Sequence, residues 1–187
     1  MGKFIIGVLI GIIILPMGAY LYLQSGYAPV ATSAPPMPFE RFLAKTALHA
    51  ALRREAPKTH TTTGSPALLA EGAEVFTHNC AVCHGLPGQP PTAIAKGEFP
   101  PPPQLFTQRG MVTDDPVGVT YWKVKHGIRL TGMPGFDPSL TDEQIWAVSL
   151  LMRNADHLTP ALQAILSPQP PSPPQAVQTK KAAPKRK

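Results

Sequence analysis

The sequence contains only two cysteines among its 187 residues, Cys80 and Cys83. A structural zinc site needs four ligands, usually from two separated Cys or His pairs, and the chain has no second C-x-x-C pair. A lipid-attached N-terminus would need a cysteine near residue 25, and none is present there. Any cysteine chemistry in this chain is therefore confined to one short motif.

Charge is missing from a long N-terminal stretch. Residues 4–23 carry no charged side chain and consist mainly of Ile, Leu, Val, Gly and Met. As a helix they would extend about 30 Å at ~1.5 Å per residue, which matches the hydrocarbon core of a bilayer. A signal peptide cleaved near residues 31–33 is the alternative, but the apolar run is longer than a usual signal core. We expect residues 1–24 to be an uncleaved membrane anchor.

Acidic residues are absent from the C-terminal 29 positions, residues 159–187, which hold five Lys or Arg. The net charge of +6 is therefore unevenly distributed, because residues 64–158 carry nine acidic and six basic side chains. The basic character belongs to the flanking segments, and no basic patch coincides with a nucleic-acid recognition motif. We predict no nucleic-acid partner.

Proline divides the chain into segments. Residues 25–63 are expected to form a Pro-rich spacer, interrupted by one helix over 39–56 that contains no Gly or Pro. This helix would lie on a partner, on the membrane surface or back on the domain that follows, or it would be a solvated spacer helix without a packing partner. Residues 159–187 are rich in proline and are predicted to be a disordered basic tail. This leaves residues 64–158 as the folded domain.

No segment of that domain alternates with the period of a strand, so the predicted fold class is all-α, with three main helices. The first begins at Ser65 as N-cap, with Pro66 in the favoured first position, and ends near residue 78. The second runs from about residue 115 to a C-terminal cap at Gly127. The third begins with a capping box formed by Thr141 and Gln144 and ends near residue 154.

Residues 80–84 read C-x-x-C-H, the spacing of a covalently attached c-type haem. The thiols of Cys80 and Cys83 can form thioether bonds to the two haem vinyl groups, and His84 can bind the iron from one face. A thioredoxin-type redox pair would need a βαβ context, which the sequence does not indicate. We predict one covalent haem c, which would supply apolar volume that a domain of this size lacks.

Residues 65–157 resemble the class I cytochromes c. The resemblance rests on an N-terminal helix, the C-x-x-C-H motif, a long loop, a Gly-Met-Pro element and a C-terminal helix. It implies that the first and last helices cross at a small residue. Gly72 and Phe76 on the first helix, with Trp146 and Leu150 on the last, fit such a crossing.

The same resemblance implies that Met133, in the sequence Thr-Gly-Met-Pro-Gly-Phe, is the second axial ligand of the iron. Met111, Met152 and His126 are the other candidates. We expect Met152 to lie in the core and His126 to cap the second helix.

The resemblance further implies that a proline carbonyl after the motif accepts a hydrogen bond from His84 Nδ1, and we expect this to be Pro91, with Pro90 next. Residues 100–103 should form a stiff wall over part of the ring, with Leu105 near it. The side chains of Tyr121, Trp122 and Arg129 would donate to the haem propionates.

These features predict a one-electron carrier and not an enzyme, because His/Met ligation fills both axial positions of the iron. Haem attachment in the family occurs outside the cytoplasm, so we expect a single-pass protein of the bacterial inner membrane with its haem domain in the periplasm. Its partners would be the lipid bilayer and redox proteins: a quinol-oxidising complex, a terminal oxidase or a dehydrogenase. Two alternatives remain: a fixed electron-transfer subunit of a larger complex, and a haem-based sensor or ligand-binding module.

Overall fold

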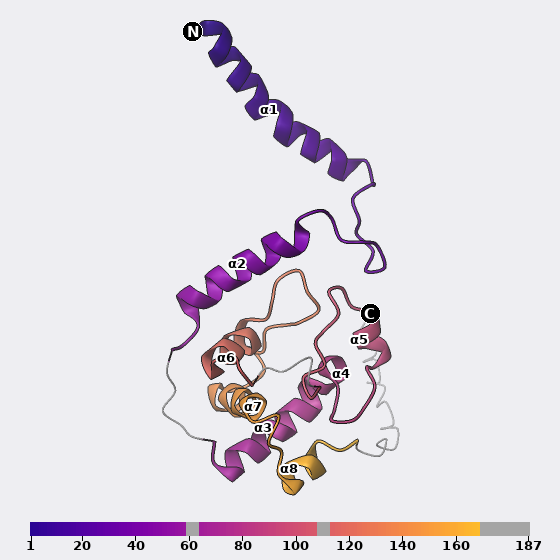
Figure 1. Cartoon of the computed structure of the whole chain (residues 1–187), viewed down its shortest axis with the longest axis vertical. Coiled ribbons are helices and arrows are strands. Elements are labelled where there is room, and N and C mark those ends of the chain that lie inside the picture. The colour runs from indigo at the N-terminus through magenta and orange to yellow at the C-terminus, as the bar shows by residue number, and fades with distance from the viewer. Residues whose placement is uncertain (59–63, 108–112, 169–187) are drawn as a thin grey trace, which may run out of the picture.

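The computed structural model describes residues 1–58, 64–107 and 113–168. Within these ranges the backbone forms helices and no strand, as the all-α prediction requires. Figure 1 shows α3, α4, α6, α7 and α8 gathered in one body, with α1 standing apart from it. The helices are α1 (Gly2–Gln24), α2 (Glu40–Glu55), α3 (Pro66–Asn79), α4 (Ala81–His84), α5 (Ala93–Gly97), α6 (Val117–His126), α7 (Asp142–Arg153) and α8 (Pro160–Ile165).

The three main helices of the domain begin and end where local signals predict. Ser65 accepts a hydrogen bond from the Leu68 amide at 3.2 Å and caps α3. Thr141 and Gln144 form both bonds of the capping box at the start of α7. Gly127 ends α6 with a φ of +67°, a backbone conformation that glycine adopts without steric cost. Short-range capping chemistry therefore sets the boundaries of these helices.

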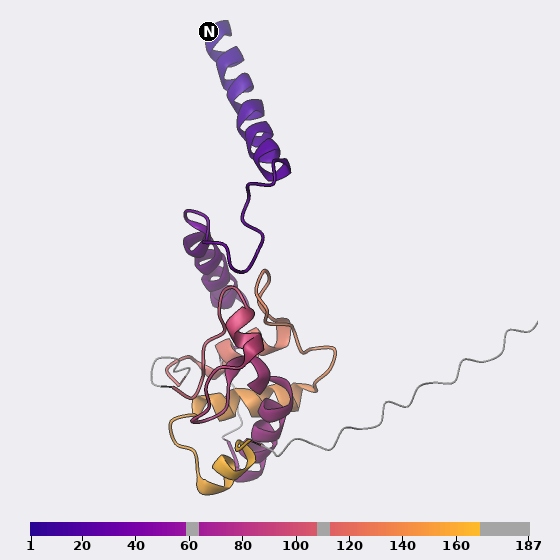
Figure 2. The ribbon, with the colours of Figure 1, turned by 90° about the vertical axis from the view of Figure 1, so that its right-hand side faces the viewer.

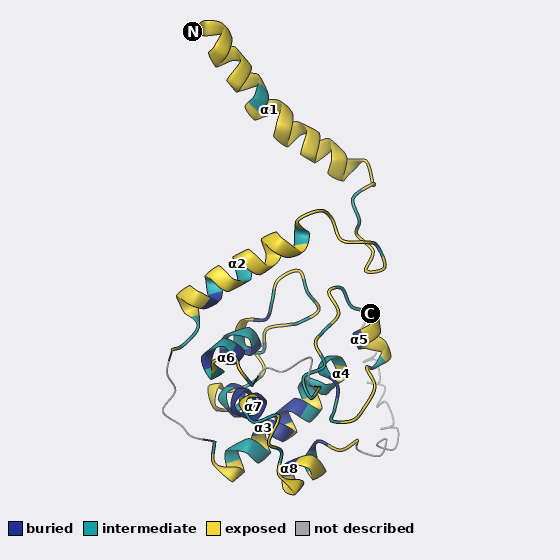
Figure 3. Cartoon of the chain, in the orientation of Figure 1, coloured by how far each residue is buried: buried dark blue, intermediate teal, exposed yellow. Residues whose placement is uncertain are grey.

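The core forms where α3 crosses α7. Figure 3 shows the buried residues concentrated on these two helices and on α6. Gly72 lies against the backbone of α7 at Ala147, so closely that a Cβ atom would overlap the Ala147 carbonyl. One turn further along α3, Phe76 is only 1% exposed and packs edge-on against Phe106, with ring centroids 5.1 Å apart. The predicted crossing at Gly72 is present, and its immediate partner on α7 is Ala147.

This contact predicts a measurable cost for adding one methyl group. We expect Gly72→Ala to lower the free energy of unfolding by about 1–3 kcal/mol, because the helices must separate and overpacking costs this much. The higher helix propensity of alanine, about 1 kcal/mol, would offset part of that loss. Guanidinium chloride titration measures the change. Gly97→Ala is the control, since nothing lies within 4 Å of its Cβ position. Equal midpoints for the two variants would contradict the close crossing.

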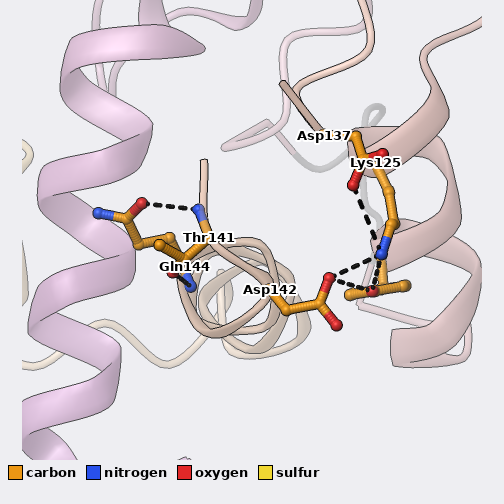
Figure 4. A network of polar contacts seen from close by, with 6 residues as sticks. Lys125, Asp137, Thr141, Asp142 and Gln144 are labelled. Atoms are coloured by element: carbon orange, nitrogen blue, oxygen red, sulfur yellow. Dashed lines mark hydrogen bonds and ion pairs between the residues drawn. The ribbon is translucent and has the colours of Figure 1, made fainter. Parts of the chain in front are cut away.

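A polar network ties the end of α6 to the start of α7 (Figure 4). Lys125 Nζ lies 2.7 Å from Asp142 Oδ1 and 3.5 Å from Asp137 Oδ1. The Lys125 ammonium lowers the pKa of the Asp142 carboxyl, and that carboxylate in turn raises the pKa of Lys125. A cation in the last turn of α6 and an anion in the first turn of α7 also complement both helix dipoles. The network therefore fixes how these two helices meet.

The C-terminal boundary of the domain differs from the prediction. Thr159 caps α8, and Leu162 and Leu166 are 5% and 1% exposed in the same core as α3. The prediction of a disordered tail from residue 159 is therefore wrong for residues 159–166. Pro160 occupies the first turn of a helix, where proline is favoured, so proline content alone was misleading here. Residues 169–187 of the predicted tail lie outside the described residues.

The helix expected over residues 39–56 is observed as α2, and it packs back on the domain. Figures 1 and 2 both show α2 beside α6. Leu52 is 8% exposed, and Trp122 Nε1 on α6 donates to Glu55 Oε2 at 3.2 Å. Of the alternatives considered for this helix, the structure shows the one in which it lies on the domain.

The N-terminal helix α1 is long and apolar enough to cross a membrane by length and composition. It has no buried residue, and Figure 3 shows it exposed along almost its whole length. A membrane span and a signal sequence both have these properties.

Candidate haem site

The C-x-x-C-H motif forms the junction between two helices. Cys80 is the C-cap of α3, and α4 begins at the next residue. The carbonyl of Cys80 accepts hydrogen bonds from the amides of His84 at 2.9 Å and Cys83 at 3.1 Å. This single helical turn fixes the spacing of two thiols and one imidazole, and all three side chains line one cavity.

That cavity has a volume of about 270 Å³ and mostly apolar walls. Helices α3, α6 and α7 contribute buried side chains to it, and the loops after α5 and α6 complete it. The predicted proline wall and Leu105 both line it. The principal apolar lining residues are Phe76, Pro100, Pro101, Pro102, Pro103, Leu105, Val124, Met133, Phe136, Val148 and Met152.

As free thiols, before any thioether bond forms, both cysteines lie in surroundings that favour the protonated form. Burial raises the pKa of Cys80 to about 12 and that of Cys83 to about 11. Cys83 Sγ also donates to Glu98 Oε1 at 2.9 Å, which raises the pKa of Cys83 further toward that value. Redox-active and metal-binding thiols need an accessible thiolate. Among the described residues, no group of three or more His, Cys, Asp or Glu is placed to hold a metal ion.

The imidazole of His84 is oriented by the proline wall. Its Nδ1 lies 2.9 Å from the carbonyl oxygen of Pro103, and an Nδ1–H donor there leaves Nε2 free for a metal. The expectation of Pro91, with Pro90 next, is therefore wrong. Helix α5 lies between α4 and Pro103 and redirects the chain, so the accepting carbonyl comes 19 residues after His84.

The loop after α6 brings Met133 into the cavity. The Met133 carbonyl accepts a hydrogen bond from the Ile128 amide at 3.2 Å, and its amide donates to Thr131 Oγ1 at 3.1 Å. A Cβ atom at Gly127 would overlap the backbone at Gly135, so the two ends of the loop meet at a glycine. These contacts fix the loop with the methionine side chain facing the cavity.

The other candidate ligands are placed differently. Met152 lines the cavity, but it is 2% exposed and belongs to the core side of α7. His126 is exposed near the end of α6, where its ring centroid lies 5.1 Å from that of Trp122. Met111 lies outside the described residues.

Comparison with known proteins identifies the family. The family model described as "Cytochrome C oxidase, cbb3-type, subunit III" matches residues 67–152. Cytochrome c6 of Synechococcus elongatus is 36% identical over 81 residues, a match that covers 43% of this chain and 83% of that protein. Cytochrome c6 of Thermosynechococcus vestitus shows the same identity, with 64% of its length covered. The chain belongs to the class I c-type cytochromes.

Membership of this family means that the cytochrome carries covalent haem c and takes part in electron transfer. The cavity fits that cofactor. Cys80 and Cys83 offer two thiols for the vinyl groups, His84 presents a free Nε2, and the apolar walls suit a porphyrin ring. When bound, the haem supplies an iron that changes its charge by one electron.

Three residues expected around the haem of this cytochrome do not line the cavity. Tyr121 donates to Asp142 Oδ1 at 2.8 Å, and Trp122 donates to Glu55, so neither is available to a propionate. Both point toward neighbouring helices because α6 uses one face to pack on α7 and another to receive α2. Arg129 is exposed.

Sequence reasoning also missed two polar residues beside the haem motif. Gln104 Nε2 donates to the Cys83 carbonyl at 3.0 Å and so joins α4 to the proline wall. Glu98 lines the cavity and accepts from the Cys83 thiol. Neither belongs to a motif, and both reach the site because the segment after α5 folds back over α4.

Proposed function

We propose that this cytochrome is a membrane-anchored one-electron carrier whose haem iron is bound by His84 and Met133. The observation that supports the proposal is that both side chains line the same cavity as the two cysteines. A methionine sulfur is a weak donor that favours Fe(II) and raises the reduction potential. Two protein ligands leave the iron no open position for oxygen, peroxide or another small ligand. Electron exchange then needs little rearrangement at the metal.

The proposed anchor is α1. Its 23 residues would extend about 35 Å at ~1.5 Å per residue, enough to span a hydrocarbon core of about 30 Å. We place the haem domain on the periplasmic side of a bacterial inner membrane. Donor and acceptor would be membrane or periplasmic redox proteins: a quinol-oxidising complex, a terminal oxidase or a dehydrogenase.

A fixed subunit of a larger oxidoreductase complex is the second candidate function. It is favoured by the matching family model, whose description names a subunit of an oxidase. A mobile carrier and a fixed subunit share the same haem chemistry and differ in how long they stay with their partner. Purification of the tagged protein from detergent-solubilised membranes separates them, because only a fixed subunit co-purifies in constant stoichiometry.

The proposed ligand set and anchor are tested together on membranes that contain the full-length protein. We expect the haem protein to resist extraction by high salt and alkaline carbonate, because a spanning helix is not released by either. We expect the ferric form to show the Fe–S(Met) absorption band and the ferrous form not to bind carbon monoxide at neutral pH. Release into the soluble fraction would refute the anchor. Carbon monoxide binding by the native protein would favour a sensor or ligand-binding module.

A further inference from the structure

One residue that lines the haem cavity comes from outside the region that matches the family. Leu48, on α2, lines the same cavity as Cys80 and Met133, although the match begins at residue 67. Leu48 is partly buried, whereas Leu43 on the same helix is 63% exposed. Leu52 is buried, and Leu48 and Glu55 lie on the same face of α2 at spacings of four and three residues, with the exposed Glu55 carboxylate reaching Trp122.

Helix α2 is held in this position by a close backbone approach and a hydrogen bond to α6. Gly118 lies directly under the carbonyl of Pro57, where a Cβ atom would overlap the carbonyl oxygen. One turn further along α6, Trp122 donates to Glu55 at 3.2 Å. Gly118 and Trp122 are four residues apart and lie on one face of α6. The close approach at a glycine and the directed hydrogen bond together fix the register of α2 on α6.

The segment before α2 approaches the same site. Residues 29–32 and 34–36 line a second cavity, of about 310 Å³, together with Glu40, Phe99 and Leu130. Phe99 immediately precedes the proline wall, and Leu130 lies in the loop that carries Met133. The spacer therefore adjoins both loops that enclose the haem cavity.

We propose that residues 29–57 form an intramolecular cover for the haem, and that Leu48 is a cofactor-contacting residue of this cytochrome. The inference rests on the proposed function only in placing the haem in this cavity. The cover keeps water from one edge of the ring, which destabilises the more highly charged Fe(III) form and raises the reduction potential. It also directs partner proteins to a different part of the haem surface.

The test compares Leu48→Asp with Leu43→Asp in the full-length protein in detergent. We expect Leu48→Asp to shift the redox equilibrium about tenfold toward Fe(III), equivalent to a potential lower by ~59 mV for one electron. A carboxylate and the water that accompanies it would both stabilise the oxidised iron. Leu43→Asp places the same charge on an exposed position and should leave the potential near that of the native protein.

A second variant displaces the cover without substituting any residue that lines the cavity. Gly118→Ala introduces a methyl group that Pro57 cannot accommodate, so α2 should detach from α6. We expect a lower potential here as well, and a several-fold faster electron exchange with small inorganic oxidants. Haem content and a cooperative unfolding transition confirm that each variant is folded.

The outcomes separate this inference from the proposed function. Equal potentials for Leu48→Asp, Leu43→Asp and Gly118→Ala would overturn the cover, even if the native Fe–S(Met) band is present. A native protein without that band would refute the proposed ligand set, while a specific effect of Leu48→Asp would still support the cover.

Discussion

The Cys80→Ser, Cys83→Ser double variant is expected to lose its haem and, with it, the cooperative fold of the cytochrome domain. The cavity is lined by core residues of three helices, among them Phe76, Val124 and Val148. Without the ring these side chains would face an empty or wet space of about 270 Å³. At ~24 cal/mol per Å³ of cavity, that space costs roughly 6 kcal/mol. The stability of a whole domain is typically only about 5–15 kcal/mol.

Circular dichroism during guanidinium chloride titration measures this effect. We expect the double variant to show reduced helix content and no sharp transition, with near-ultraviolet signals of fixed tertiary packing lost. The control is Val82→Ser, which changes an exposed residue between the cysteines and leaves both thiols in place. A double variant that unfolds cooperatively with a native-like midpoint would show that the haem is not needed for folding.

Met133→Ala should convert a closed iron site into an open one. Loss of the thioether leaves His84 as the remaining proposed ligand, so the Fe–S(Met) band disappears and the ferrous iron binds carbon monoxide. The reduction potential should fall by an appreciable fraction of the roughly 0.8 V that axial ligation spans across haem proteins. The fold should persist, because the contacts that fix the loop involve backbone atoms. The Ile128 amide still donates to the carbonyl of residue 133, and Gly127 still lies against the backbone of Gly135.

The matched control is Met152→Leu, because Met152 lines the same cavity from α7. This substitution conserves volume and usually costs less than about 1.5 kcal/mol. It should retain the absorption band and remain inert to carbon monoxide. The reverse pattern, with the band kept in Met133→Ala and lost in Met152→Leu, would reassign the ligand to α7.

The features that could be predicted from the sequence depend on neighbouring residues. Ser65, Gly127 and the capping box at Thr141 mark helix boundaries because each acts within a few residues of its own backbone. The C-x-x-C-H motif is likewise complete within five positions. Such signals do not need the fold in order to be interpreted.

The features that were missed depend on how distant segments meet. Pro103 replaces Pro91 as the partner of His84 because α5 redirects the loop, and a helix of five residues gives little periodic signal. Leu48 reaches the cavity because α2 packs on α6, through the approach of the Pro57 carbonyl to Gly118 and the hydrogen bond from Trp122 to Glu55. The proline content was also misleading at α8. Pro160 begins this helix, and Leu162 and Leu166 pack into the core.

The docking of α2 changes how far the haem can travel from the proposed anchor. If α2 left the domain and stayed helical, residues 25–63 could span roughly 100 Å, from 23 extended residues at ~3.4 Å and 16 helical residues at ~1.5 Å each. With α2 attached to the domain, only residues 25–39 separate it from α1, and the limit falls to about 50 Å. The volume that the haem can search is then roughly eightfold smaller. Detachment of α2 from the domain would therefore increase the distance that the haem domain can move from the proposed anchor, without any change in covalent structure.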